Sequence, residues 1–420
     1  MKITLTQFRP NTAEAVWTDC FAQAIAELHK TGGGVLTVPA GEYSTGPIEL
    51  CSNMELHLEP GAVIRFLNDP AAFPLQECQY EGRISHRPKP CLSAFNAENV
   101  ALTGSGVLDG CGAPWWAAQR ARTLANGRPY LLHFENVTHL RVCGVQLRNS
   151  PAWTVHPLNC VDVLIEDVSI CNPYNSPNTD GINPESCRDV RILNCRVDVG
   201  DDCITLKSGT EETPSPVPCE NIVIANCLLV HGHGGIVIGS EMSGGVRNVT
   251  VTNCVFTGTD RGLRVKTRRR RGGCVENLRL SNLVMERVFC PFVFNMYYSC
   301  GTAEKDRWVW EKTPYPVDGG TPAFRNIRIS GVTVVGATAS AGFFYGLAES
   351  PIDGLSLTDC HIEMARGAAP EKPAMMGNLE PMSARGFFLR NAKNVEFHNV
   401  TLKNADGEAY DTDESVDGEF

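Results

Sequence analysis

The feature that most constrains the fold of this chain is a short repeat. From about residue 95 onward, a phrase that starts with Asn or Asp followed by Val, Ile or Leu recurs, and its successive copies between residues 136 and 277 lie 26 to 32 residues apart. A period of this length is typical of solenoids, in which each repeat is one coil that packs against its neighbours. The phrase starts at Asn99, Asn136, Asp162, Asp189, Asn221, Asn248, Asn277, Asn326 and Asn394.

Each repeat contains short stretches of alternating apolar and polar residues, many of them β-branched, as in residues 247–254. Such alternation predicts strands. Units this short have no room for two strands and a crossover helix, so we expect them to stack as coils of a parallel β-helix, with equivalent residues about 4.8 Å apart. The predicted fold class is all-β, with a single domain over residues 1–420 and the main coils over residues 95–405.

The segments outside the repeat have their own predicted roles. Residues 1–65 should form the N-terminal cap and the first coils. Within them, residues 18–30 carry apolar side chains at helical spacing and precede three glycines, which predicts an amphipathic helix that covers the open end of the stack. Residues 66–93 and 299–325 break the period and should project as loops, and residues 406–420 should form a C-terminal tail.

Composition excludes several functions. The formal net charge of −10 argues against general binding of nucleic acid, and no stretch is apolar enough for a membrane span. The N-terminus has no apolar export segment, so we expect a cytoplasmic protein whose 18 cysteines are reduced thiols, and the absence of any CxxC pair gives no support for a zinc site. Residues 266–271 form a basic island, which is either a solvated loop or part of a site for an anionic substrate.

Four consecutive coils align without gaps at residues 180–186, 202–208, 234–240 and 261–267. This register predicts inward ladders of apolar residues, one of which contains Ile182, Ile204, Ile236 and Leu263. The alternate residues point outward. They form two rows, one of Asn183, Thr205, Val237 and Arg264 and the other of Glu185, Lys207, Gly239 and Lys266.

The same alignment brings acidic residues together. Asp180 and Asp202 occupy equivalent positions on adjacent coils, Asp201 precedes Asp202, and His233 lies one coil further along. A single Asp in a turn usually caps backbone groups, but a cluster of like charges costs stability unless it serves a function. Carboxylates of this kind suit glycoside hydrolysis, in which one acid protonates the leaving oxygen and another carboxylate activates water. Arg264 and Lys266 on the next coil favour an acidic sugar as the ligand.

Four motifs occur in a fixed order: AsnThrAspGly at 178–181, GlyAspAspCys at 200–203, GlyHisGly at 232–234 and ArgValLys at 264–266. Together they resemble the signatures of the polygalacturonases, glycoside hydrolase family 28, although Val265 stands where the family usually has Ile. The resemblance implies a right-handed parallel β-helix of the pectin-lyase type. It also implies hydrolysis of α-1,4-galacturonosidic bonds in galacturonan or oligogalacturonides, with inversion and without a metal or cofactor.

The resemblance further implies a role for each matching residue. Asp201 would be the general acid, Asp180 and Asp202 would activate water, and His233 would assist by hydrogen bonding. Asn178, Arg264, Lys266 and Tyr298 would bind substrate, with Tyr297 as a rival for the last position. Inversion requires a water between base and sugar, which predicts about 6.5 to 9.5 Å between Asp201 and the carboxylates that hold the water.

A cytoplasmic enzyme would meet short acidic oligosaccharides rather than polymeric pectin, so an exo-acting, bacterial type of polygalacturonase is expected. Hydrolysis of rhamnogalacturonan or xylogalacturonan is the nearest alternative. A calcium-dependent pectate lyase and a non-catalytic, glycan-binding β-helix are the more distant ones. The oligomeric state is left open.

Overall fold

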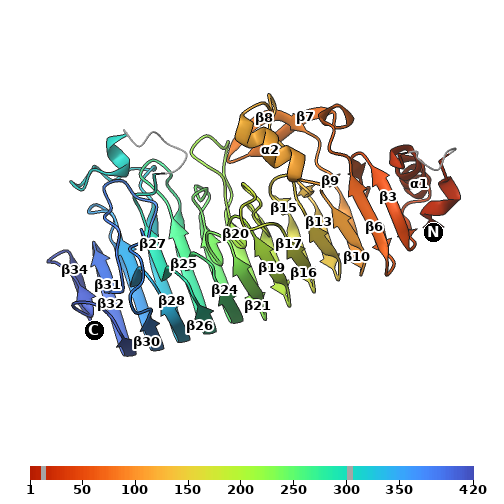
Figure 1. Ribbon diagram of the computed structural model, residues 1–420. Helices are drawn as coiled ribbons and strands as arrows, with labels where there is room; N and C mark the ends of the chain where they lie inside the picture. The colour runs from red at the N-terminus through yellow and green to blue at the C-terminus, as the bar shows by residue number, and fades with distance from the viewer. Residues whose placement is uncertain (11–15, 300–305) are drawn as a thin grey trace. The chain divides into compact units, whose positions relative to one another are not determined.

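The computed structural model describes residues 1–10, 16–299 and 306–420. The chain folds as two compact units, Met1–Asp201 and Asp202–Phe420. In each unit, short parallel strands from successive coils lie side by side and form the right-handed parallel β-helix expected from the repeat (Figure 1). The predicted all-β fold class is therefore confirmed.

Unit 1, Met1–Asp201, contains two sets of parallel strands. The strands of its sheet B are β4 (Ile48–Glu49), β9 (Leu92–Phe95), β12 (Leu132–Glu135) and β15 (Val155–Leu158). Those of its sheet A are β1 (Lys2–Thr4), β2 (Gly34–Val38), β3 (Gly41–Thr45), β5 (Met54–Leu58), β6 (Ala62–Phe66), β10 (Glu98–Gly104), β11 (Val107–Asp109), β13 (Thr138–Cys143), β14 (Gln146–Arg148), β16 (Val161–Glu166), β17 (Ser169–Cys171), β18 (Arg188–Leu193) and β19 (Arg196–Val199).

The core of unit 1 consists of apolar ladders. In sheet A, strand register stacks equivalent side chains on successive coils, and each member of the ladder is fully buried. Parallel strands buried in this way are stabilised mainly by removal of apolar surface from water. One such ladder contains Leu56, Leu102, Val142, Ile165 and Ile192.

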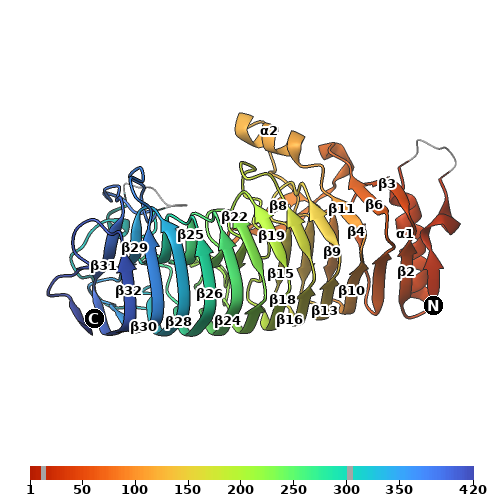
Figure 2. The ribbon, with the colours of Figure 1, turned by 60° about the horizontal axis from the view of Figure 1, so that its bottom comes forward.

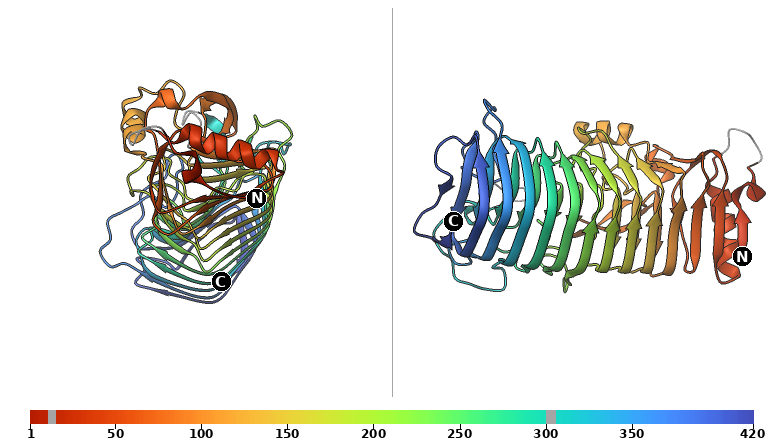
Figure 3. Two further views of the ribbon diagram at one scale, coloured as in Figure 1. Left: turned by 90° about the vertical axis from the view of Figure 1, so that its right-hand side faces the viewer. Right: turned by 90° about the horizontal axis from the view of Figure 1, so that it is seen from below.

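The predicted N-terminal helix is confirmed as α1 (Thr18–Lys30), which buries its apolar face, including Phe21 and Leu28. Figure 3 shows α1 lying across the end of the stack in unit 1, beside β2. A short 3₁₀ helix at Leu5–Phe8 packs against it. A second helix, α2 (Ala113–Ala121), was not anticipated; Trp115 and Trp116 anchor it to the unit.

The first segment that breaks the repeat is more regular than expected. Residues 66–93 contain a 3₁₀ turn at Pro70–Ala72 and an antiparallel hairpin of β7 (Leu75–Tyr80) and β8 (Arg83–Pro88). The prediction of a plain loop was wrong in this respect. Antiparallel pairing satisfies the backbone of an inserted segment locally, without the period of the coils.

Unit 2, Asp202–Phe420, repeats the arrangement, and Figure 2 shows its longer strands side by side. Its sheet B contains β20 (Ile204–Leu206), β23 (Ile236–Ile238), β25 (Arg261–Lys266), β27 (Cys290–Asn295), β29 (Ser340–Tyr345), β31 (Arg385–Arg390) and β33 (Tyr410–Asp411). Its strands in sheet A are β21 (Cys219–Ala225), β22 (Leu228–His231), β24 (Val246–Thr257), β26 (Cys274–Glu286), β28 (Ala323–Ala337), β30 (Ile352–Met364), β32 (Ala392–Lys403) and β34 (Val416–Glu419).

Unit 2 also contains two less regular segments, residues 299–325 and 406–420. The segment 299–325 has a 3₁₀ turn at Arg307–Val309 and reaches β28 at its end, while residues 300–305 lie outside the described part of the chain. The segment 406–420, named above as a tail, carries β33 and β34, which pair with β31 and β32.

The predicted register holds in unit 2. Ile204 pairs with Ile236, which pairs with Leu263, and all three are buried in the core. One residue further along, Thr205, Val237 and Arg264 are stacked in the same way. The outward row that contains Arg264 is thus aligned as the sequence indicated.

The residue that opens each repeat has a structural role. All nine Asn and Asp residues that start the phrase have a positive φ, between 51° and 60°, a left-handed conformation that Asn and Asp adopt more readily than most residues. In unit 2 their side chains form an asparagine ladder, because Asn248 donates to Asn221 (3.0 Å), Asn277 to Asn248 (3.1 Å) and Asn326 to Asn277 (2.7 Å). The repeat therefore marks the turn where each coil enters sheet A.

No disulfide joins the cysteines of the described residues, and Cys300 lies outside them. Most of these thiols are buried and act as small apolar side chains. Among the same residues, no helix is both long and apolar enough to cross a membrane.

Candidate active site

In unit 1, the two expected acidic residues are close together. Asp180 is 4% exposed and Asp201 is half-buried, and one carboxylate oxygen of each lies within 4.8 Å of the other. This spacing is shorter than the 6.5 to 9.5 Å expected for this pair from inversion, so that geometric prediction was wrong. The reason is that Asp201 lies on the turn directly after β19, which brings it back toward the turn that carries Asp180.

Hydrogen bonds fix the turns that carry these two residues. The amide of Gly200 donates to the hydroxyl of Thr179 (3.3 Å), which also shares a hydrogen bond with Ser176 (2.6 Å). A Cβ on Gly200 would lie 2.4 Å from the carbonyl oxygen of Ser176, so only glycine permits this approach. A hydrogen bond from the backbone of Gly200 to the side chain of Thr179 therefore joins the AsnThrAspGly and GlyAspAspCys motifs.

Two neighbours of the carboxylates were not identified as site residues from the sequence. Asn183 donates from Nδ2 to Oδ2 of Asp180 (3.0 Å) and orients that carboxylate. Arg128 donates from Nη2 to Oδ1 of Asn178 (2.6 Å). The outward position of Asn183 in the coil alignment could have identified it as a site residue. Arg128 precedes β12 and lies outside the four aligned segments, so nothing in the alignment indicated that it belongs to the site.

The two carboxylates of unit 1 are oxygen ligands of the kind that Ca²⁺ accepts. Ca²⁺ takes about six to eight oxygens, so Asp180 and Asp201 alone do not define a calcium site.

In unit 2, Asp202 is the anion of a buried triad. Its Oδ1 accepts a hydrogen bond from Arg264 Nη1 (3.0 Å) and its Oδ2 accepts one from Lys266 Nζ (2.7 Å), and the three residues are 2%, 3% and 7% exposed. Burial raises the pKa of Asp202, but Lys266 and Arg264, with a smaller effect from His233, outweigh burial and hold this pKa well below its usual range. Asp202 is therefore ionised and suited to polarise water, not to donate a proton.

The GlyHisGly motif makes room for this triad. A Cβ on Gly234 would lie 2.5 Å from Val237 Cγ2 and 3.2 Å from Oδ1 of Asp202. Glycine at this position lets the carboxylate and Arg264 approach the turn, while His233 remains exposed beside it.

Tyr297 and Tyr298, the two tyrosines considered for substrate binding, have different neighbours in the structure. The ring of Tyr298 lies 5.7 Å from the guanidinium of Arg264 and 5.3 Å from the ammonium of Lys266. Tyr297 is fully buried and instead lies beneath Lys312 and near Arg269. Tyr298 is thus the tyrosine that accompanies the cationic pair.

The basic island at 266–271 is neither a solvated loop nor an open anion site over most of its length. Arg268 and Arg271 are buried and both pair with Glu211, at 2.5 and 2.6 Å. Arg269 is buried and pairs with Glu349 (2.5 Å). Arg270 is exposed and lies over the ring of Trp308. Apart from Lys266, these charges serve the fold.

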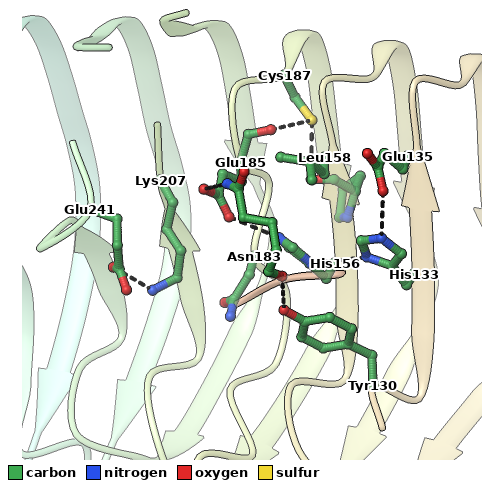
Figure 4. Close-up of polar contacts among 12 residues, drawn as sticks. Tyr130, His133, Glu135, His156, Leu158, Asn183, Glu185, Cys187, Lys207 and Glu241 are labelled. Carbon is green, nitrogen blue, oxygen red and sulfur yellow. Dashed lines mark hydrogen bonds and ion pairs between the residues drawn. The ribbon is translucent and has the colours of Figure 1, made fainter. Parts of the chain in front are cut away.

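Sheet B of unit 1 carries a buried polar network on its outward rows (Figure 4). Nδ1 of His133 lies 3.0 Å from Nδ1 of His156, and Nε2 of His156 lies 3.0 Å from Glu185. The hairpin β7–β8 covers this network, because Gln79 donates to Glu185 (2.5 Å) and accepts from the hydroxyl of Tyr130 (2.6 Å). As a result, His133 and His156 have no exposed surface.

Unit 2 carries a comparable buried pair on the outward row. Lys207 donates from Nζ to Glu241 (2.9 Å), as Figure 4 shows. Burial raises the pKa of Glu241, but Lys207 outweighs it and lowers the value to about 2. The coil alignment placed Lys207 on this row but could not identify Glu241 as its partner.

Comparison with known proteins gives a consistent result. The model of the family "Glycosyl hydrolases family 28" matches residues 35–364. A probable polygalacturonase from Vitis vinifera is 31% identical over 84% of this chain and 72% of its own length, and an endo-polygalacturonase from Pectobacterium carotovorum is 30% identical over 63% and 69%. The crystal structure of an exopolygalacturonase from Thermotoga maritima is 29% identical and superposes with a TM-score of 0.75 over 96% of this chain and 92% of that one.

The family model covers more than half of the chain, so the chain belongs to family 28 of the glycosyl hydrolases. It is accordingly a glycoside hydrolase of the polygalacturonase family.

Proposed function

We propose that this enzyme hydrolyses α-1,4-galacturonosidic bonds in galacturonan or short oligogalacturonides, and that it is exo-acting and inverts the anomeric centre. The observation that carries the proposal is the buried triad of Asp202, Arg264 and Lys266, with Asp201 as the next residue along the chain. Asp202 is ionised, and Asp201, its neighbour along the chain, has a different environment. Two carboxyl groups in different environments can have different pKa values, which lets one act as the general base and the other as the general acid.

Each residue has a role in this mechanism. Asp201 donates a proton to the leaving glycosidic oxygen, and Asp202 and Asp180 orient and deprotonate the attacking water. His233, exposed beside Asp202, assists by hydrogen bonding. Substrate is bound by Asn178, Arg264, Lys266 and Tyr298. No step requires a metal or a cofactor.

The cationic residues explain the preference for an acidic sugar. A substrate carboxylate near Arg264 and Lys266 gains charge-assisted hydrogen bonds, each worth about 1.5 to 3 kcal/mol. Both cations also hold Asp202, so the substrate carboxylate shares donors with the carboxylate that polarises water. The same two residues thereby couple binding of galacturonate to the chemistry.

Replacing Lys266 with Met should lower kcat/KM for trigalacturonate by about 10- to 100-fold, because one charge-assisted contact to the substrate is lost. Lys266→Arg keeps the charge and should retain more activity than Lys266→Met. Steady-state kinetics on the two variants measure the difference. Equal kinetics of the native enzyme and Lys266→Met would remove Lys266 from substrate binding.

Two observations support exo action. The hairpin β7–β8 covers His133 and His156 on the outward rows of sheet B in unit 1, where an endo-acting enzyme needs an open groove for a long chain. The exopolygalacturonase from Thermotoga maritima superposes on nearly the whole chain. A cytoplasmic location, which we also propose, fits this mode, since short oligogalacturonides are the substrates that such an enzyme meets.

In a digest of tetragalacturonate, monogalacturonate should therefore be the first product, and chromatography at early times measures it. Early dimer without monomer would show an endo-acting or dimer-releasing enzyme.

Proton NMR of the same digest should show an inverted anomeric centre in the released sugar, and retention would reject the inverting mechanism. A product that absorbs ultraviolet light and disappears with a chelator would indicate a lyase, whereas binding with no release of reducing sugar would indicate a non-catalytic protein.

A further inference from the structure

Unit 1 contains a buried positive charge, Arg128, that has no counter-ion among the described residues. Arg128 is 3% exposed, and its guanidinium donates to the carbonyl oxygens of Pro151 (2.9 Å) and Pro177 (2.6 Å) and to Oδ1 of Asn178 (2.6 Å). All of these acceptors are neutral. No carboxylate of the described residues forms an ion pair with Arg128.

Arg128 differs in this respect from every other buried arginine among the described residues. Among the buried arginines of the part of the chain that the structure describes, the other five each have a carboxylate oxygen within 3.2 Å, and Arg128 alone has none. Burial of a charge without an opposite charge nearby is costly in free energy. The five other buried arginines avoid this cost because each pairs with a carboxylate. The paired arginines are Arg261, Arg264, Arg268, Arg269 and Arg271.

A second unpaired cation lies beside the first. Arg87, on strand β8 of the hairpin, is half-buried and donates from Nη2 to the carbonyl oxygen of Arg128 (3.2 Å). Its guanidinium lies 3.8 Å from the ring centre of Tyr80 and packs against Gly127, where a Cβ would lie 2.7 Å from Nη2. No described carboxylate pairs with Arg87 either. The glycine and the aromatic ring hold this guanidinium in one place.

These two cations lie next to the AsnThrAspGly motif. Arg128 contacts Asn178 directly, and the charges of Glu81 and Asp180 act on Arg128 without forming an ion pair with it. Arg87 belongs to the hairpin that covers the buried network of His133, His156 and Glu185. In an exo-acting enzyme, the sugar that reaches such a closed end is the terminal one, which is released.

We propose that Arg87 and Arg128 form an anion subsite that binds the carboxylate of the sugar unit released by the enzyme. Arg87 presents free guanidinium N–H donors to the ligand, and Arg128 supplies a second positive charge behind it while it orients Asn178. The inference rests on the proposed function and goes further than it, because it names the substrate group that the hairpin recognises and explains why the two arginines have no carboxylate partner among the described residues.

The test uses trigalacturonate and the same trimer with the carboxylate of the released unit converted to a methyl ester. With the native enzyme, the ester should lower kcat/KM by about 10- to 100-fold, because it removes the anion that the two arginines bind. Arg87→Met should lower kcat/KM for trigalacturonate by a similar factor and should no longer distinguish the two trimers. Arg87→Lys keeps the charge and should restore part of the discrimination.

Arg83→Met is the matched control, since Arg83 lies on the same strand and is exposed. This variant should discriminate between the trimers as the native enzyme does. Melting temperatures of all variants separate misfolding from loss of the subsite. If Arg87→Met is folded and discriminates as strongly as the native enzyme, or if the native enzyme does not discriminate at all, the inference is overturned. If the native enzyme cleaves neither trimer, the proposed function fails instead.

Discussion

Replacing Asp201 with Asn should lower the turnover of galacturonides by about 100-fold or more, while the fold and much of the substrate binding persist. The loss of a general acid has this size because the leaving oxygen must then depart without a proton from the enzyme. The amide of Asn is nearly the same size as the carboxyl group, so packing of the turn after β19 is kept. Steady-state kinetics on trigalacturonate measure kcat.

Asp198→Asn is the control for this experiment, because it removes the same charge three residues earlier on β19. Its turnover should stay close to that of the native enzyme. Near-native turnover of Asp201→Asn would exclude Asp201 as the proton donor, whereas a loss of activity accompanied by a lower melting temperature would assign the effect to folding.

Replacing Asp202 with Asn should both abolish most turnover and lower the free energy of unfolding by about 3 to 5 kcal/mol. The stability loss follows because Arg264 and Lys266 would remain buried without their anion. Denaturant unfolding at pH 7 measures this difference. An Asp202→Asn variant as stable as the native enzyme would contradict the assignment of Asp202 as the counter-ion.

The pH dependence of this difference has a defined sign. The pKa of Asp202 in the folded state is below its value of about 3.9 in the unfolded chain, so its contribution to stability is fully present above that value. The contribution should shrink as the pH falls toward the folded-state pKa. The gap in stability between the native enzyme and Asp202→Asn should therefore be smaller at pH 3 than at pH 7.

In a double-mutant cycle, the losses in free energy of unfolding caused by Asp202→Asn and by Lys266→Met should be less than additive.

Much of the fold could be predicted because each copy of the repeat begins with a residue type that the local backbone conformation requires. Residues such as Asn248 and Asn277 occur where each coil needs a left-handed turn, so the spacing of these residues gives the period directly. The alternation of apolar residues then sets the register, which is why Arg264 was correctly aligned with Val237.

Other features depend on contacts between distant segments and could not be predicted. The hairpin at residues 75–88 is an insertion whose strands pair with each other and leave no trace in the coil period. The basic island has its carboxylate partners at Glu211 and Glu349, which are 57 to 80 residues away, so the sequence could not show whether its charges were free. The choice between Tyr297 and Tyr298 likewise required the positions of Lys312 and Lys266.

The asparagine ladder gives the stack of coils in unit 2 a direction. In every step described above, the amide nitrogen of the later coil donates to the amide oxygen of the earlier one, so the side-chain dipoles of Asn221, Asn248, Asn277 and Asn326 all point the same way. Aligned dipoles polarise one another, as they do in hydrogen-bonded chains of amides. A newly added coil thus meets a row of acceptors already oriented to receive its asparagine, and the ladder can act as a template that fixes the rotational position of each coil on the one before it.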